Sequence, residues 1–143
     1  MIEQIIDQNQ LLAIIVSQKF DKPGVNFFTS GEMSQQLAYI HHPVGKIIKP
    51  HIHKPVVREV HFTQEVLFIK KGKLRVDLYD DRQQYIASRI LETGDAILLA
   101  RGGHGFEVIE EVEAIEVKQG PYVGDRDKVL FEGISAEQTT MKS

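Results

Sequence analysis

Residues 66–79 read VLFIKKGKLRVDLY, and the pattern of this stretch decides the fold class. Its first four residues are apolar, as in a buried strand, and the Lys-Gly-Lys step at residues 71–73 predicts a tight turn. Residues 74–79 then alternate apolar and polar side chains. Because successive side chains of a strand point to opposite faces, this alternation is typical of a half-exposed strand. The stretch therefore predicts two consecutive β-strands.

Comparable short runs recur along most of the chain and predict an all-β sandwich or barrel. The first ten residues also fit a short helix, because Ile2, Ile5 and Ile6 fall on one helical face. A final hairpin is expected with its acidic turn at residues 110–113. The expected strands cover residues 11–16, 25–29, 36–40, 46–53, 56–70, 74–79, 85–91, 96–100, 106–109 and 114–118.

Length and composition point to one soluble globular domain. The chain has 143 residues, 42% of them hydrophobic, and a net charge of −3. We expect one domain over residues 1–134 and a mobile tail over 135–143. The charge gives no attraction to nucleic acid or to an acidic membrane, and the absence of a signal-like N-terminus predicts a cytoplasmic location. The expected core side chains are Phe68, Leu74, Val76, Ile97, Leu99, Phe106, Val108 and Ile115.

Three histidines and one glutamate form the candidate metal site. His51 and His53 are two residues apart, so on a strand both imidazoles share one face. Glu65 lies on the following strand, and His104 follows a glycine pair. The chain has no cysteine, so any metal is held by nitrogen and oxygen atoms. This set suits a divalent transition metal such as Fe, Mn, Ni, Zn or Co.

These residues resemble the two sequence motifs of the cupin superfamily. The first motif is a glycine, five residues, His-x-His, a short gap, a glutamate, six residues and a glycine. Here Gly45, His51, His53, Glu65 and Gly72 follow that order. Eleven residues separate His53 from Glu65, where the family usually has three or four.

The second motif is represented by Gly94 and His104, with Ala100 in place of the family's proline and one residue fewer before the histidine. The resemblance implies a cupin-type (double-stranded β-helix, or jelly-roll) barrel of two antiparallel sheets with the metal inside. It also implies His51, His53, Glu65 and His104 as the metal ligands. Small cupins often pair through their sheets, so a homodimer is expected by analogy.

The function implied is that of a metal-dependent enzyme, an oxygenase or an isomerase, acting on a small polar metabolite. His61 is a candidate for proton transfer, a further metal ligand or a strand residue facing solvent, and Arg101 a candidate for holding a substrate carboxylate or phosphate. Two alternatives stay open. One is a cupin that binds a small ligand without catalysis. The other is a metal-free sugar-nucleotide isomerase or epimerase linked to polysaccharide biosynthesis.

Overall fold

The computed structural model describes residues 1–139, and within them the chain is all-β with no α-helix. Contacts divide it into two compact units. One unit contains Met1–Phe20 together with the described residues from Phe62 onward, and the other is Asp21–His61. The sequence prediction of a single domain over residues 1–134 stays a prediction. No helix among the described residues is long and apolar enough to cross a membrane.

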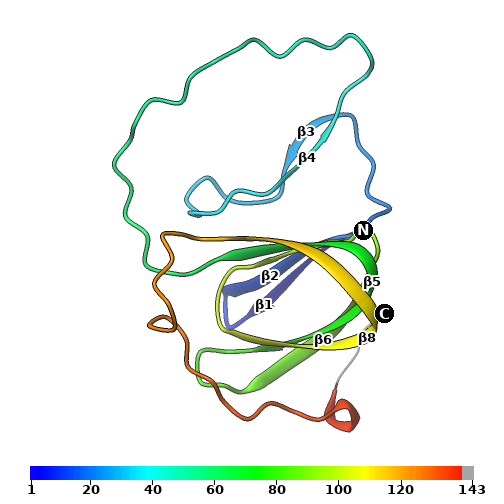
Figure 1. Ribbon diagram of the computed structural model, residues 1–143, viewed down its shortest axis with the longest axis vertical. Coiled ribbons are helices and arrows are strands. Elements are labelled where there is room, and N and C mark those ends of the chain that lie inside the picture. The colour runs from blue at the N-terminus through cyan, green and yellow to red at the C-terminus, as the bar shows by residue number, and fades with distance from the viewer. Residues whose placement is uncertain (140–143) are drawn as a thin grey trace. The chain divides into compact units, whose positions relative to one another are not determined.

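The larger unit is built on one antiparallel sheet (Figure 1). Strands β1, β2, β7, β5 and β6 follow one another across it, and β8 pairs with β5. The strands are β1 (Ile2–Asp7), β2 (Gln10–Val16), β5 (Glu65–Tyr79), β6 (Tyr85–Glu92), β7 (Ala96–Leu99) and β8 (Gly103–Lys118). A short 3-10 helix, Ala136–Gln138, lies within the segment that was expected to be a mobile tail, whose residues 140–143 are outside the described residues.

The smaller unit contains one hairpin, β3 (Gly24–Phe27) paired with β4 (Ala38–His41). The carboxylate of Asp21 accepts a hydrogen bond from the Tyr39 hydroxyl at 3.2 Å and lies 2.7 Å from His41 Nδ1. No strand forms in residues 42–64. The expected strand over residues 46–53 is therefore wrong, and the one expected over 56–70 begins only at Glu65.

The N-terminal residues form a hairpin, so the helical alternative for this segment is wrong. Asp7 pairs with Gln10, and the two residues between them, Gln8 and Asn9, both have positive φ angles of 47° and 62°. Positive φ at both central positions is the mark of the two-residue turn whose twist matches that of paired strands. The local turn therefore overrides the helical spacing of the isoleucines.

The Lys-Gly-Lys step is a bend inside β5 and not the predicted turn. Lys71 pairs with Glu113 and Lys73 with Glu110, so three residues of β5 face four of β8 across this bulge. Gly72 has φ +95°, and a Cβ at this position would overlap the carbonyl oxygen of Glu111. Bulges of this kind bend a strand without ending its pairing.

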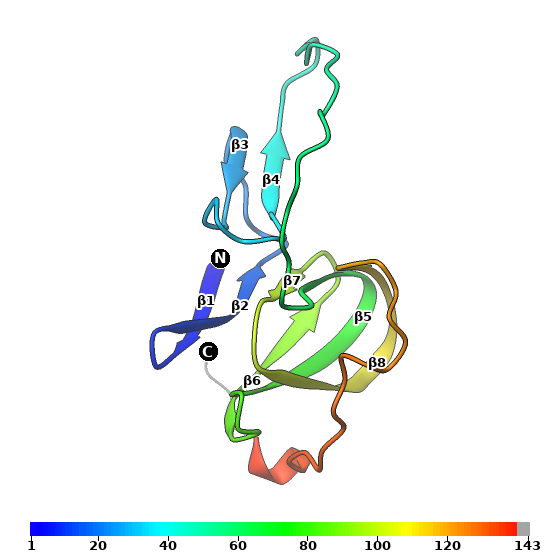
Figure 2. The ribbon, with the colours of Figure 1, turned by 90° about the vertical axis from the view of Figure 1, so that its left-hand side faces the viewer.

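β8 runs as one continuous strand through residues 110–113, so the predicted hairpin with an acidic turn there is also wrong. Before the bend β5 pairs with β7, and after it with β6. The sheet therefore curls into a half-barrel (Figure 2). Both halves of β5 contribute side chains to one core: Leu67 and Ile69 before the bend, and Leu74, Val76 and Leu78 after it.

The core fills the concave side of this curled sheet. Four of the predicted core residues, Leu74, Val76, Ile97 and Leu99, are buried there together with Ile69 and Leu91, among others. The other four are exposed: Phe68, Phe106, Val108 and Ile115. Phe68 and Ile115 pair with each other on the opposite face, one residue out of phase with the core positions. Phe106 and Val108 lie on β8, which in the described residues has only β5 as a neighbour.

Replacing Gly72 with alanine should destabilise the protein by more than about 2 kcal/mol, because the new methyl group meets backbone and the positive φ disfavours any side chain. Urea unfolding measures this difference. Gly105→Ala is the matched control, since its Cβ would meet nothing within 4 Å. The control should stay within about 1 kcal/mol of the wild type. Equal effects of the two substitutions would contradict a bend held by close backbone contact.

Candidate functional site

Glu65 and His104 come together on the core-facing side of the curled sheet. Glu65 is the first residue of β5 and lies two and four residues before the core residues Leu67 and Ile69. All three side chains therefore share one face of the strand. His104 lies opposite the core residue Leu78 in the β5–β8 pairing. A carboxylate oxygen of Glu65, Oε2, lies 3.7 Å from Nε2 of the His104 imidazole. Two of the four predicted metal ligands are therefore neighbours in the structure.

A second carboxylate, Glu116, shares this environment and was not predicted from the sequence. It pairs with Leu67 and so lies on the same face as Glu65. Burial raises the pKa of the Glu65 carboxyl, and the hydrogen bond and negative charge of Glu116 raise it further. Lys118 and Lys128 offset this rise in part. The paired carboxyl groups therefore favour either a proton or a bound cation between them.

The imidazole of His104 is held in its neutral form. Burial lowers its pKa below the ordinary value of 6.5, and the negative charge of Glu116 opposes this shift only in part. The Glu65–His104 contact is consequently not an ion pair at neutral pH. Neutral imidazole is also the form that can bind a metal ion.

His51 and His53 lie in the smaller unit and are exposed. They are not on a strand, but their rings still lie 5.0 Å apart, centre to centre, in an edge-to-face arrangement. Nδ1 of His51 is 2.9 Å from the backbone carbonyl oxygen of Lys49. Because a carbonyl only accepts hydrogen bonds, Nδ1 of His51 is the donor, and in the tautomer that makes this contact Nε2 bears the lone pair.

His61 and Arg101 have partners of their own. Nε2 of His61 lies 3.6 Å from the carboxylate of Glu59, and both side chains are exposed. Nε of Arg101 donates to the carboxylate of Asp81 at 3.1 Å, and its guanidinium lies 4.7 Å from the centre of the Phe62 ring. The catalytic role of His61 and the substrate-binding role of Arg101 stay predictions.

Within residues 1–139, no group of three or more His, Cys, Asp or Glu side chains gathers closely enough to hold a metal ion. The structure thus brings together Glu65 with His104 in one unit and His51 with His53 in the other.

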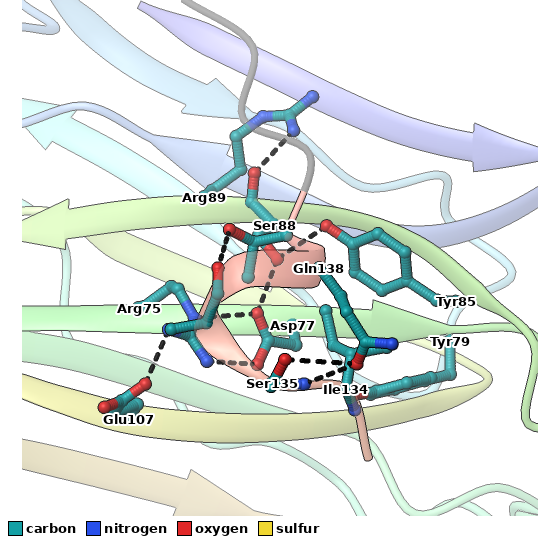
Figure 3. Close-up of polar contacts among 12 residues, drawn as sticks. Arg75, Asp77, Tyr79, Tyr85, Ser88, Arg89, Glu107, Ile134, Ser135 and Gln138 are labelled. Carbon is teal, nitrogen blue, oxygen red and sulfur yellow. Dashed lines mark hydrogen bonds and ion pairs between the residues drawn. The ribbon is translucent and has the colours of Figure 1, made fainter.

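A polar cluster on the opposite face of the sheet was also missed. Arg75 and Asp77 belong to the stretch that was predicted to be half exposed, yet both are buried. Ser88 of β6 donates a hydrogen bond to Asp77 (Figure 3). Opposite charges at positions 75 and 77, on one face of a strand, were the sequence signal for an ion pair. Their burial could not be read from the local sequence, because residues 129–134, which lie beside them, are more than 50 residues further along the chain.

Comparisons with known proteins identified no relative: no family model, no curated protein and no solved structure matches this chain. The resemblance to cupins stays a prediction from the sequence motifs.

The raised pKa of Glu65 predicts a pH dependence of stability that Glu65→Gln removes. A carboxyl whose pKa is higher in the folded than in the unfolded chain contributes stability that is fully present below its unfolded value, 4.5. That contribution is lost as the pH rises through the folded-state pKa. In metal-free protein, the free energy of unfolding of Glu65→Gln should therefore increase relative to the wild type from pH 4.5 upward.

Urea unfolding across the pH range measures this trend. Glu113→Gln, which changes an exposed carboxyl on the same pair of strands, is the matched control and should show no comparable increase. A Glu65→Gln difference that is constant with pH would argue against a raised pKa.

Proposed function

We propose that this chain is a metal-binding protein of the cupin type, with a divalent ion held by His51, His53, Glu65 and His104. The observation that carries the proposal is the meeting of Glu65 and His104, with 3.7 Å between Oε2 and Nε2. Ligand atoms about 2.1 Å from a shared ion are roughly 3–3.5 Å apart. A small side-chain adjustment would therefore let both bind one ion.

The chemistry of this pair fits a cation. Lys118 and Lys128 compensate only part of the negative charge of a buried carboxyl with a second carboxyl beside it, as the raised pKa of Glu65 indicates. A neutral imidazole next to it supplies a nitrogen lone pair without adding charge. Imidazole and carboxylate together suit Fe, Mn, Co, Ni or Zn. Glu116 is the natural group to orient or share charge with Glu65 at such a centre.

The His51 contact supports the same assignment. Metal-bound histidines usually donate their other ring N–H to a carbonyl or carboxylate, which orients the ring and fixes the tautomer. His51 makes this contact to the carbonyl of Lys49 and keeps Nε2 free. Its ring packs edge-on against His53. The sequence motif, not a structural contact, assigns this pair as the two further nitrogen ligands of the proposed site.

The finer prediction of a jelly-roll barrel belongs to the same proposal. Its support is the curled antiparallel sheet, with Glu65 and His104 on the face that carries the core. When bound, the ion supplies a Lewis acid for an oxygen atom of a small polar metabolite. In this proposal His61, beside Glu59, moves a proton, and Arg101 holds an anionic group of the substrate.

Metal content tests the proposed site. Protein purified without chelators should contain about one equivalent of a divalent transition metal by elemental mass spectrometry. Alanine at position 51, 53 or 104, or glutamine at position 65, should lower the metal affinity of the reconstituted protein at least about tenfold. His42→Ala is the matched control, because His42 is outside the proposed ligand set, and it should keep the wild-type affinity.

Unchanged metal binding by His104→Ala, with its fold confirmed by circular dichroism, would sink the proposed site. So would an equal loss in His42→Ala, which would indicate non-specific binding by surface histidines.

The role of His61 is tested separately from metal binding. His61→Ala should retain the metal and lower turnover about 100-fold in O₂-uptake or isomerisation assays on a panel of keto and enediol metabolites. Stoichiometric metal without turnover by the wild type would instead indicate a protein that binds its ligand without catalysis.

A further inference from the structure

A half-open cavity of about 420 Å³ lies on the larger unit, between β5, β8 and the C-terminal segment Val129–Ile134. This volume is within the range of small-molecule sites, about 300–1,000 Å³. Its walls are of two kinds. Arg75, Asp77 and Glu107 form a charged part, and Tyr79, Phe106 and Phe131 form an aromatic part.

The charged part contains more negative than positive charge. Nε and Nη2 of Arg75 donate to the two carboxylate oxygens of Asp77, each at 3.0 Å. Nη1 of Arg75 forms an ion pair with Glu107, its partner across the β5–β8 pairing (Figure 3). All three guanidinium nitrogens therefore contact carboxylates, and two carboxylates share one cation. An anionic ligand would meet a guanidinium that two carboxylates already share.

The two carboxylates supply hydrogen-bond acceptors in this part of the cavity. Asp77 already receives the Arg75 pair and the Ser88 hydroxyl. Glu107 is 52% exposed, and its ion pair to Arg75 uses Oε2. The other carboxylate oxygen of Glu107 is thus the natural partner for a positively charged donor that enters the cavity.

The aromatic part is held in place by the C-terminal segment. The Phe131 ring packs edge-on against Tyr79 at a centroid distance of 5.0 Å. In the same segment, the backbone N–H of Ile134 donates a hydrogen bond to the Tyr79 hydroxyl at 3.1 Å. Aromatic faces attract cations as well as apolar groups. The walls of the cavity therefore combine carboxylate excess with fixed aromatic rings.

We propose that this cavity binds a small organic cation, an ammonium group on an apolar body. The ammonium group pairs with Glu107, and the body packs against Phe106 and Phe131. His104 also lines the cavity, but the cation site needs no metal there. Binding to metal-free protein is therefore expected, and it separates this site from the proposed metal centre.

The test uses two probes of equal size, 2-phenylethylammonium and its neutral analogue 2-phenylethanol. Titration of metal-free, ¹⁵N-labelled full-length protein should give a dissociation constant near the millimolar range for the ammonium probe, at least about tenfold tighter than for the alcohol. The amide signals of Gly105 and Gly133, which line the cavity, should shift. Equal affinity for the two probes would overturn the proposal.

Two substitutions locate the binding. Glu107→Gln removes the exposed carboxylate. It should lower the affinity for the ammonium probe about tenfold and leave the affinity for the alcohol unchanged. Gly105→Leu projects a side chain from a position where a Cβ meets nothing within 4 Å, and should block both probes by filling the cavity. Gly31→Leu is its matched control, equally open and outside the cavity lining, and should bind like the wild type.

Thermal unfolding of each variant shows that it is folded. Wild-type affinity for the ammonium probe in folded Glu107→Gln or folded Gly105→Leu would overturn the proposal. Should Gly105→Leu fail to fold, the Glu107→Gln comparison still decides the outcome, because the side chain of Glu107 is half exposed and its substitution leaves the core unchanged.

Discussion

The contact between Gly72 and the backbone of Glu111 is the constraint on which the rest of the larger unit depends. With no side chain, Gly72 lets β5 and β8 cross at close range while both strands bend. The bend directs the first half of β5 toward β7 and the second half toward β6. It thereby encloses Ile69, Val76 and the other core side chains between two parts of the same sheet. A sheet that stayed flat would leave that apolar face in water.

The bend also sets where the polar groups of the candidate site lie. Glu65 continues the alternation of Leu67 and Ile69 and so must point to the core side, where it meets His104. Ionised side chains are unfavourable in such surroundings, and the opposite pKa shifts of the two groups record this cost. An apolar pair would stabilise the metal-free fold at least as well. The buried acid and imidazole therefore lower the stability of the metal-free fold.

The other face of the sheet contains buried charged side chains. In the second half of β5, Val76 and Leu78 point toward the core, and Arg75 and Asp77 point to the other face. All four side chains are buried, so this half of β5 is covered on both faces. Arg75 forms ion pairs with Asp77 and Glu107, and Asp77 accepts a hydrogen bond from the Ser88 hydroxyl. Such a network is tolerated because each charged group has a partner, as buried charge requires. The C-terminal segment that covers the network is held by Tyr79, through Phe131 and Ile134.

The sequence alone determined the all-β class, because alternating apolar residues with frequent turn signals have no comparable helical solution. It also singled out Glu65, which keeps the cupin spacing to Gly72, and His104, which follows Gly94 with one residue fewer than the cupin pattern. Only the tertiary structure decided whether Lys71-Gly72-Lys73 turns or bends, because a glycine with positive φ serves both and long-range pairing with β8 makes the choice. It likewise decided that Phe68 is exposed and Arg75 buried, because burial depends on which distant segment covers a face, and local sequence does not carry that information.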